Sequence, residues 1–214
     1  DASTKSKFYY WIAERIAAYL PPSARVFNAG GGLGDLAIWL SYHVEQVTVI
    51  ENDPKAVAAF RARCPHNVVA ILGELDSYSP DKLYDALVLY DVSGAELALL
   101  LVRELSRAKT FLLVSSESAQ GEADLRALTE MFKSAGVPFT FEPFEQEHVQ
   151  PFRSREDAKS YFLFSTNRML TDEELDALLQ QSDDEAFPFS FVENKKIGML
   201  VFDAANPALK KLLF

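Results

Sequence analysis

The sequence has one cysteine, Cys64, so it cannot form an internal disulfide, and nothing in it indicates an oxidising compartment. It contains no run near the roughly 18 apolar residues of a membrane helix, and its N-terminus lacks the basic-then-apolar pattern of a secretory signal. Lys and Arg number 21 against 31 Asp and Glu, whereas proteins that bind nucleic acid carry concentrated basic surfaces. We therefore expect a cytoplasmic protein, a monomer or homodimer, with neither a membrane nor a nucleic acid as partner.

The formal net charge of −10 is spread unevenly along the chain. Residues 1–66 hold 7 Lys or Arg and 6 Asp or Glu, and residues 67–214 hold 14 and 25. The acidity therefore lies in the later part of the chain. It makes a large anionic ligand less suitable there than a neutral or cationic one.

Short apolar runs alternate with helical patterns through the first two thirds of the chain. Strands are predicted at 25–29, 46–50, 67–72, 85–90 and 110–115, and helices at 8–20, 35–42, 54–64, 94–105 and 122–136. The run at 85–90 has no polar interruption after its first residue, as expected of a parallel strand covered on both faces. This alternation predicts an α/β fold with a doubly wound, mostly parallel sheet and helices on both faces, and we expect the last strand to be antiparallel.

After Gly136 the pattern changes. An alternating stretch at 138–149 predicts an edge strand, and Ser154 and Thr171 are placed to cap two helices, Thr171 with Glu174 as a capping box. Residues 187–192 and 196–202 are predicted to be two strands of an antiparallel pair, joined through 193–195. We interpret 145–195 as a late capping insertion.

We expect one domain over 1–214. It comprises an N-terminal helix at 1–25, a cofactor-binding core at 26–136, the last strands with their insertion at 137–202, and a tail at 203–214.

A glycine-rich turn follows the first predicted strand. Asn28 and Ala29 lead into Gly30, Gly31, Gly32, Leu33 and Gly34, and glycines allow a backbone to turn sharply and approach a ligand closely. The spacing is G-x-G-x-G, whereas a dinucleotide site needs Gly or Ala where Asp35 stands, and an acid beside a pyrophosphate would repel it. The turn therefore favours a ligand without phosphates over NAD.

The second predicted strand ends in Glu51, 21 residues after Gly30, where a carboxylate can accept hydrogen bonds from both ribose hydroxyls. Together, N-A-G-G-G-L-G and V-T-V-I-E-N-D resemble the class I, seven-stranded Rossmann-like family of S-adenosylmethionine-dependent methyltransferases, and in particular those that act on small molecules. The motifs span residues 26–114.

The resemblance implies S-adenosylmethionine as cofactor and assigns roles to particular positions. Its methionine part would lie against Gly30, Gly32 and Gly34, its ribose at Glu51, and its adenine beside Asn52 and Glu74. Asp91 would lie where substrate and methyl group meet; it could instead cap the next helix.

Asn28 departs from the resemblance, since the family usually has Asp or Glu there. Glu74 also has a simpler interpretation, as a solvated loop acid.

No obligatory catalytic base is evident, because methyl transfer mainly requires positioning two reactants and excluding water. The catalytic candidates are Asp91, Tyr10 and His148. Tyr10 could equally pack its helix onto the sheet, and we interpret His148 as a surface histidine more readily than as a base.

Residues 115–118 (Ser-Ser-Glu-Ser) lack the Asp-Asn pair of metal-dependent catechol-type enzymes, so no metal site is expected.

The sequence thus predicts a methyltransferase for a small, neutral or cationic acceptor. Two alternatives remain. One is a non-catalytic cofactor-binding or assembly module on the same fold. The other is a polyamine-synthase-like aminopropyltransferase, although the second Asp of those enzymes is absent after Asp91.

Overall fold

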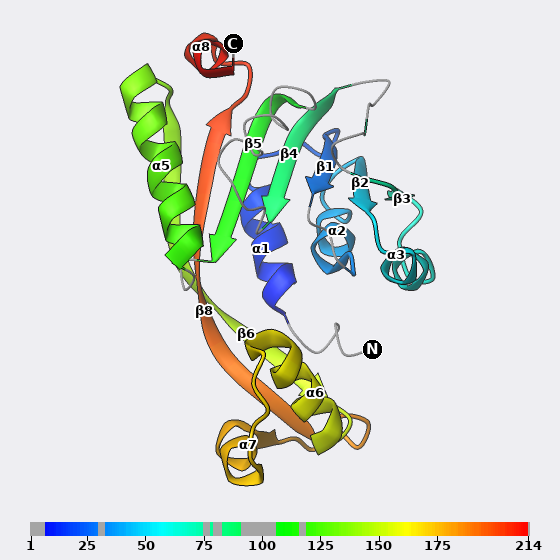
Figure 1. The fold of residues 1–214 in the computed structure, drawn as a ribbon. Helices are drawn as coiled ribbons and strands as arrows, with labels where there is room; N and C mark the ends of the chain where they lie inside the picture. Colours follow the sequence, from blue (N-terminus) through cyan, green and yellow to red (C-terminus); the bar gives the residue numbers. More distant parts are fainter. Residues whose placement is uncertain are drawn as a thin grey trace. The chain divides into compact units, whose positions relative to one another are not determined.

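A computed structural model describes residues 7–29, 33–74, 78, 83–90, 106–115 and 119–213. The elements, labelled as in Figure 1, are α1 (Phe8–Ala17), β1 (Arg25–Ala29), α2 (Asp35–Leu40), β2 (Gln46–Glu51), α3 (Pro54–Arg61), β3 (Val68–Leu72), β4 (Tyr84–Tyr90), β5 (Ser106–Ser115), α5 (Ala119–Ala135), β6 (Phe139–Phe152), α6 (Arg155–Thr166), α7 (Asp172–Leu178), β7 (Gln180–Gln181), β8 (Phe189–Asp203) and α8 (Pro207–Leu213). The helix predicted at 94–105 lies outside the described residues.

The strands form one sheet in the order β3-β2-β1-β4-β5-β8-β6, with β7 added beside β8. Strands β1 to β5 pair in parallel, and β8 pairs antiparallel to β5. The strand order reverses at β1, which lies between β2 and β4. The predicted doubly wound, mostly parallel α/β sheet with an antiparallel last strand is therefore confirmed.

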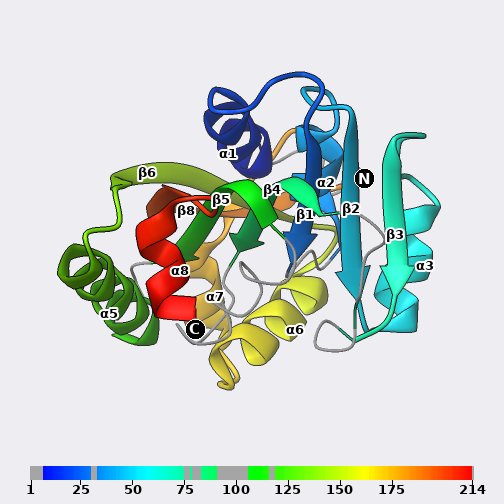
Figure 2. The same ribbon diagram turned by 90° about the horizontal axis from the view of Figure 1, so that it is seen from above.

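Helices cover both faces of the parallel strands. In Figure 2, α1 lies on one face, and α5 and α8 lie on the other. The α5 face is closed by a core that includes Phe27, Leu87 and Leu89 from the strands and Leu128 and Phe132 from α5. Since side chains alternate along a strand, Asn28 and Val88 point to the opposite face.

Local sequence signals explain several element ends. Asp53 caps α3 by accepting from the amide of Lys55 at 2.8 Å, with Pro54 at the first helical position. Ser154 caps α6, and Thr171 and Glu174 form the predicted capping box of α7. These caps accept hydrogen bonds from amides at the start of each helix, which have no carbonyl partner within the helix.

The prediction of two strands at 187–192 and 196–202 is wrong, because β8 is one continuous strand. Glu193 and Lys195 are two residues apart, so their side chains lie on the same side of the strand, where they form an ion pair at 3.5 Å. Their charges are therefore satisfied within the strand, and no turn is needed.

The described chain divides into two compact units. The small unit contains residues 146–195 with Lys7 and Phe8, and the sheet unit contains Tyr9–Glu145 and Lys196–Phe214. The small unit has its own apolar core, formed by Phe152, Ala158, Phe162, Leu170 and Leu175. Its range nearly coincides with the predicted insertion at 145–195, whose covering role stays a prediction.

Candidate functional site

The candidate site lies at the carboxyl ends of β1 to β4. Because these strands are parallel, their last residues Ala29, Glu51, Leu72 and Tyr90 face the same edge of the sheet, and Figure 1 shows the arrowheads of β1, β2 and β4 pointing the same way. Ligands bind open parallel sheets at this edge, near the point where the strand order reverses. Of the residues predicted here, Gly30, Gly32 and Asp91 lie outside the described residues.

Asn28 is the second-last residue of β1, and its side chain is buried at 1% exposure. Its Nδ2 donates to the carbonyl oxygens of Ala29, at 3.1 Å, and Val88, at 3.4 Å. Its Oδ1 has no hydrogen-bond partner in the described part of the chain. A carboxylate in the same orientation would face two carbonyl oxygens, so these acceptors favour the amide over an acid. The unpaired oxygen remains available to a donor.

Gly34 caps α2 in the left-handed conformation, with φ at 81°. A Cβ on Gly34 would lie 2.3 Å from Cε2 of Phe60, a side chain of α3 that is buried at the same place. Gly34 is therefore required for two reasons. Glycine adopts the left-handed conformation at little energetic cost, and its lack of a Cβ lets the turn contact α3 closely.

Glu51, Asn52 and Glu74 come together after β2 and β3. Oε1 of Glu51 accepts hydrogen bonds from the amides of Asn52, at 2.9 Å, and Asp53, at 3.0 Å. Nδ2 of Asn52 donates to Oε2 of Glu74 at 3.2 Å. The structure thus brings together three of the predicted site residues. One carboxylate oxygen of Glu51 fixes the turn after β2, and the other accepts no hydrogen bond from the described residues.

Two neighbouring tyrosines of α1 have different surroundings. The ring of Tyr9 packs edge-on against Tyr90, the last residue of β4, with centroids 5.8 Å apart. The ring of Tyr10 packs against Trp39 of α2 at 5.3 Å. A hydrogen bond with Glu14 raises the pKa of Tyr10, so its phenol keeps its proton and does not supply a phenolate base. This geometry favours the packing interpretation of Tyr10 and places Tyr9 at the candidate site.

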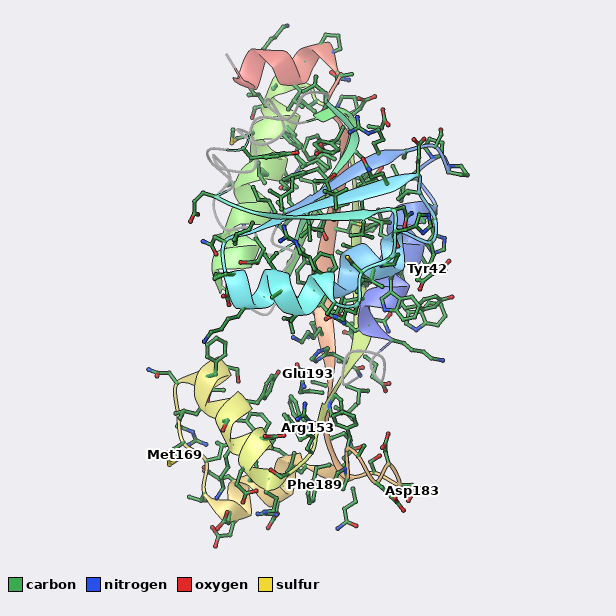
Figure 3. All side chains as sticks on the ribbon, turned by 90° about the vertical axis from the view of Figure 1, so that its right-hand side faces the viewer. Tyr42, Arg153, Met169, Asp183, Phe189 and Glu193 are labelled. Atoms are coloured by element: carbon green, nitrogen blue, oxygen red, sulfur yellow. The ribbon has the colours of Figure 1, made fainter. Side chains whose placement is uncertain are left out.

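An exposed aromatic side chain lies just beyond α2. Tyr42, labelled in Figure 3, is 69% exposed and packs against Trp39.

The interpretation of His148 as a surface histidine is wrong, since its side chain is 13% exposed. Within the small unit its ring packs edge-on against Phe8 at 5.2 Å, and its Nδ1 lies 3.3 Å from Oε1 of Glu193, without hydrogen-bond alignment. Glu193 is labelled in Figure 3. Burial, and then the charge of Lys195, lower the pKa of His148, while Glu193 opposes the shift. His148 is therefore mostly buried, and its surroundings favour the neutral imidazole.

Arg63, just beyond the end of α3, is a feature that the sequence patterns did not reveal. Its Nη1 lies 2.7 Å from Oδ1 of Asp35, and its Nη2 donates to the carbonyl oxygen of Leu33. Arg63 therefore offsets the negative charge of Asp35. Asp35 therefore repels a pyrophosphate less than its own charge implies, whereas the glycine spacing still differs from that of a dinucleotide site.

Among the described residues, no group of three or more His, Cys, Asp or Glu side chains is placed to hold a metal ion. Across the same part of the chain, no helix is both long and apolar enough to cross a membrane.

Comparison with known proteins gives a fold relationship. No protein-family model matches the sequence, and no curated protein matches it. Similar solved structures include a functionally unknown protein from Deinococcus radiodurans R1, with 13% identity, TM-score 0.56, and coverage of 91% of this chain and 85% of that one. Another is the precorrin-6y C5,15-methyltransferase from Geobacter metallireducens GS-15, with 11% identity, TM-score 0.55, and coverage of 90% and 86%.

A third is the tRNA (m1A58) methyltransferase TrmI from Aquifex aeolicus, with 15% identity, TM-score 0.55, and coverage of 92% of this chain and 68% of that one. At these identities the likeness establishes the Rossmann-like fold that methyltransferases share. It does not establish the reaction, because one fold supports many functions.

Proposed function

We propose that the protein is an S-adenosylmethionine-dependent methyltransferase whose acceptor is a small molecule. The observation that carries the proposal is the position of Glu51, which ends the strand next to β1 and keeps a carboxylate oxygen available beside Asn52 and Glu74. A carboxylate there can accept hydrogen bonds from ribose hydroxyls. The methyltransferase fold of the neighbours supports the same reaction class.

The described residues fit this cofactor. Oδ1 of Asn28 is a buried acceptor without a partner among them, and the turn at Gly34 holds backbone close to the same edge. Glu51 would hold the ribose, and Asn52 and Glu74 the adenine. When bound, S-adenosylmethionine supplies a methyl group on a positively charged sulfur, which is transferred by in-line displacement.

The acceptor side of the site would lie at the end of β4. Tyr9 and Tyr90 form an aromatic pair there, which can pack against an apolar or cationic molecule. The acids at the ends of β2 and β3 disfavour an anionic acceptor. We therefore retain a neutral or cationic small molecule as acceptor, without nucleic acid or membrane as partner, for a cytoplasmic monomer or homodimer.

The neighbours do not distinguish acceptor classes, since one name includes a precorrin and another a tRNA. A cofactor-binding module without turnover is the second candidate, favoured by the neutral Asn28 in place of an acid. An aminopropyltransferase is the third; its distinguishing position follows Asp91, outside the described residues.

Titration calorimetry with S-adenosylmethionine tests the proposal. We expect the wild-type protein to bind it, and Glu51→Gln to bind it about 1–3 kcal/mol more weakly because a ribose hydroxyl loses a charged acceptor. The glutamine keeps one carbonyl oxygen for the amides of Asn52 and Asp53. Glu45→Gln is the matched control, since Glu45 is an exposed acid just before β2, at the opposite end of that strand.

Binding of NADH in place of S-adenosylmethionine would contradict the proposal. Equal affinity of the Glu51→Gln and Glu45→Gln variants would remove Glu51 from the site. Cofactor binding without methyl transfer to any of a broad panel of acceptors would favour the module.

A further inference from the structure

The turn between β1 and α2 is held from one side by α3 and the residues that follow it. The ring of Phe60 occupies the space where a Cβ of Gly34 would lie. The guanidinium of Arg63 binds on both sides of the same glycine, to the carbonyl oxygen of Leu33 and to the carboxylate of Asp35. Three consecutive residues of the turn therefore contact this one segment.

The contacts of Arg63 are of a kind that restricts geometry. A guanidinium is planar and presents its N–H groups in a fixed fork, so two acceptors bound to it are held at a defined spacing. The side chains of Arg63 and Asp35 are only 24% and 17% exposed, which reduces screening by solvent. Leu33 and Asp35 are consequently fixed relative to each other, with Gly34 between them.

The same helix also begins at the candidate site. Glu51 fixes the turn that leads into α3, and Asp53 caps its first turn. One segment, from Glu51 to Arg63, thus links the acid at the end of β2 to the glycine turn after β1. The relative position of these two parts decides whether they can contact one ligand together.

We propose that Arg63 is a positioning residue for the cofactor, which holds the backbone of Leu33, Gly34 and Asp35 in the arrangement that binds S-adenosylmethionine. Arg63 acts through the turn and does not itself need to touch the ligand. This inference rests on the proposed function, since it names how the same site is held in its binding geometry.

Arg61 provides a matched control on the same helix. Its Nε and Nη2 donate to the carbonyl oxygen of Ala70, at 3.1 and 2.7 Å. Arg61 therefore also joins α3 to backbone through a guanidinium, but at β3 and away from the glycine turn. A general loss of α3 packing should affect both variants alike.

The experiment compares Arg63→Ala, Arg63→Lys and Arg61→Ala in two measurements, at a temperature below every unfolding transition. Affinity for S-adenosylmethionine is measured by calorimetry, and hydrogen exchange of the amides of residues 33–36 is measured without ligand. We expect Arg63→Ala to weaken binding about tenfold and to speed exchange at the turn. Arg63→Lys, which can keep one of the two contacts, should fall between it and the wild type, and Arg61→Ala should change the affinity less than twofold.

The failures of the two proposals are distinguishable. If the wild type binds S-adenosylmethionine and Arg63→Ala matches it in affinity and exchange, the role of Arg63 is overturned while the proposed function stands. If Arg61→Ala weakens binding as much as Arg63→Ala, the effect is general packing and the positioning role is also overturned. If the wild type does not bind, the proposed function fails, and the cofactor role of Arg63 with it. Should Arg63→Ala not fold, the comparison of Arg63→Lys with Arg61→Ala decides the matter.

Discussion

At the scale of single residues, polar groups of the candidate site also hold the local backbone. Oε1 of Glu51 accepts from two backbone amides, and Nδ2 of Asn28 donates to two carbonyl oxygens. The remaining oxygen of each side chain, Oε2 of Glu51 and Oδ1 of Asn28, has no partner among the described residues. One half of each group is thus fixed by the fold, which orients the other half for a ligand without further loss of side-chain entropy.

His148 supplies a residue-scale prediction on pH. Burial and Lys195 lower its pKa in the folded protein below the ordinary value of about 6.5, so the unfolded chain binds its proton more tightly. The contribution of His148 to the free energy of unfolding should therefore fall as the pH is lowered from above 7 through 6.5, and that contribution should level off below the folded pKa. Urea unfolding at several pH values measures this dependence.

Replacing the histidine isolates its contribution. His148→Gln should show a smaller loss of stability between pH 7 and 5 than the wild type, because its side chain does not titrate. His66→Gln is the control, since His66 is exposed. A pH dependence of His148→Gln that equals the wild type's would contradict the description of His148 as a buried neutral group.

At the scale of elements, α3 connects two parts of the candidate site. It packs Phe60 against the glycine turn and follows directly on the strand that ends in Glu51. The turn after β1 is therefore a tertiary arrangement, not a local one, and its glycine is required by a neighbour as well as by its own backbone angle.

Substituting two glycines in the left-handed conformation separates these requirements. Gly34 and Gly136 have φ of 81° and 69°, but only Gly34 has a neighbour within 4 Å of a new Cβ. Gly136→Ala should lower the free energy of unfolding by about 1–2 kcal/mol for the backbone alone, and Gly34→Ala by about 2–5 kcal/mol, since overpacking against Phe60 adds to it. If thermal or urea unfolding showed equal losses of stability for the two variants, the side chain of Phe60 would move aside without an energetic penalty.

Element positions followed from local patterns, and contacts between distant residues did not. Buried strands and the capping box of Thr171 and Glu174 depend on neighbouring residues, so spacing predicted them. The pair Arg63–Asp35 joins residues 28 apart, and no pattern marks which arginine reaches the turn. The polar stretch around Asn194 suggested a turn because composition alone does not register that Glu193 and Lys195 pair along one strand.

At the scale of the whole molecule, the negative charge is concentrated in one unit. Residues 146–195 hold 5 Lys or Arg against 11 Asp or Glu, so this quarter of the chain carries −6 of the net −10. Several of these acids are paired within the small unit, as Asp172 is with Arg155 and Lys159, and Glu174 with Arg168. The remaining excess disfavours an anionic partner for this unit.

A crystal structure of the protein with bound S-adenosylmethionine tests the central claim most directly. We predict that the ribose hydroxyls lie within hydrogen-bond distance of the Glu51 carboxylate, with the adenine beside Asn52 and the sulfur toward the end of β4. Cofactor bound away from the carboxyl ends of β1 and β2, with Glu51 making no contact to it, would contradict the account.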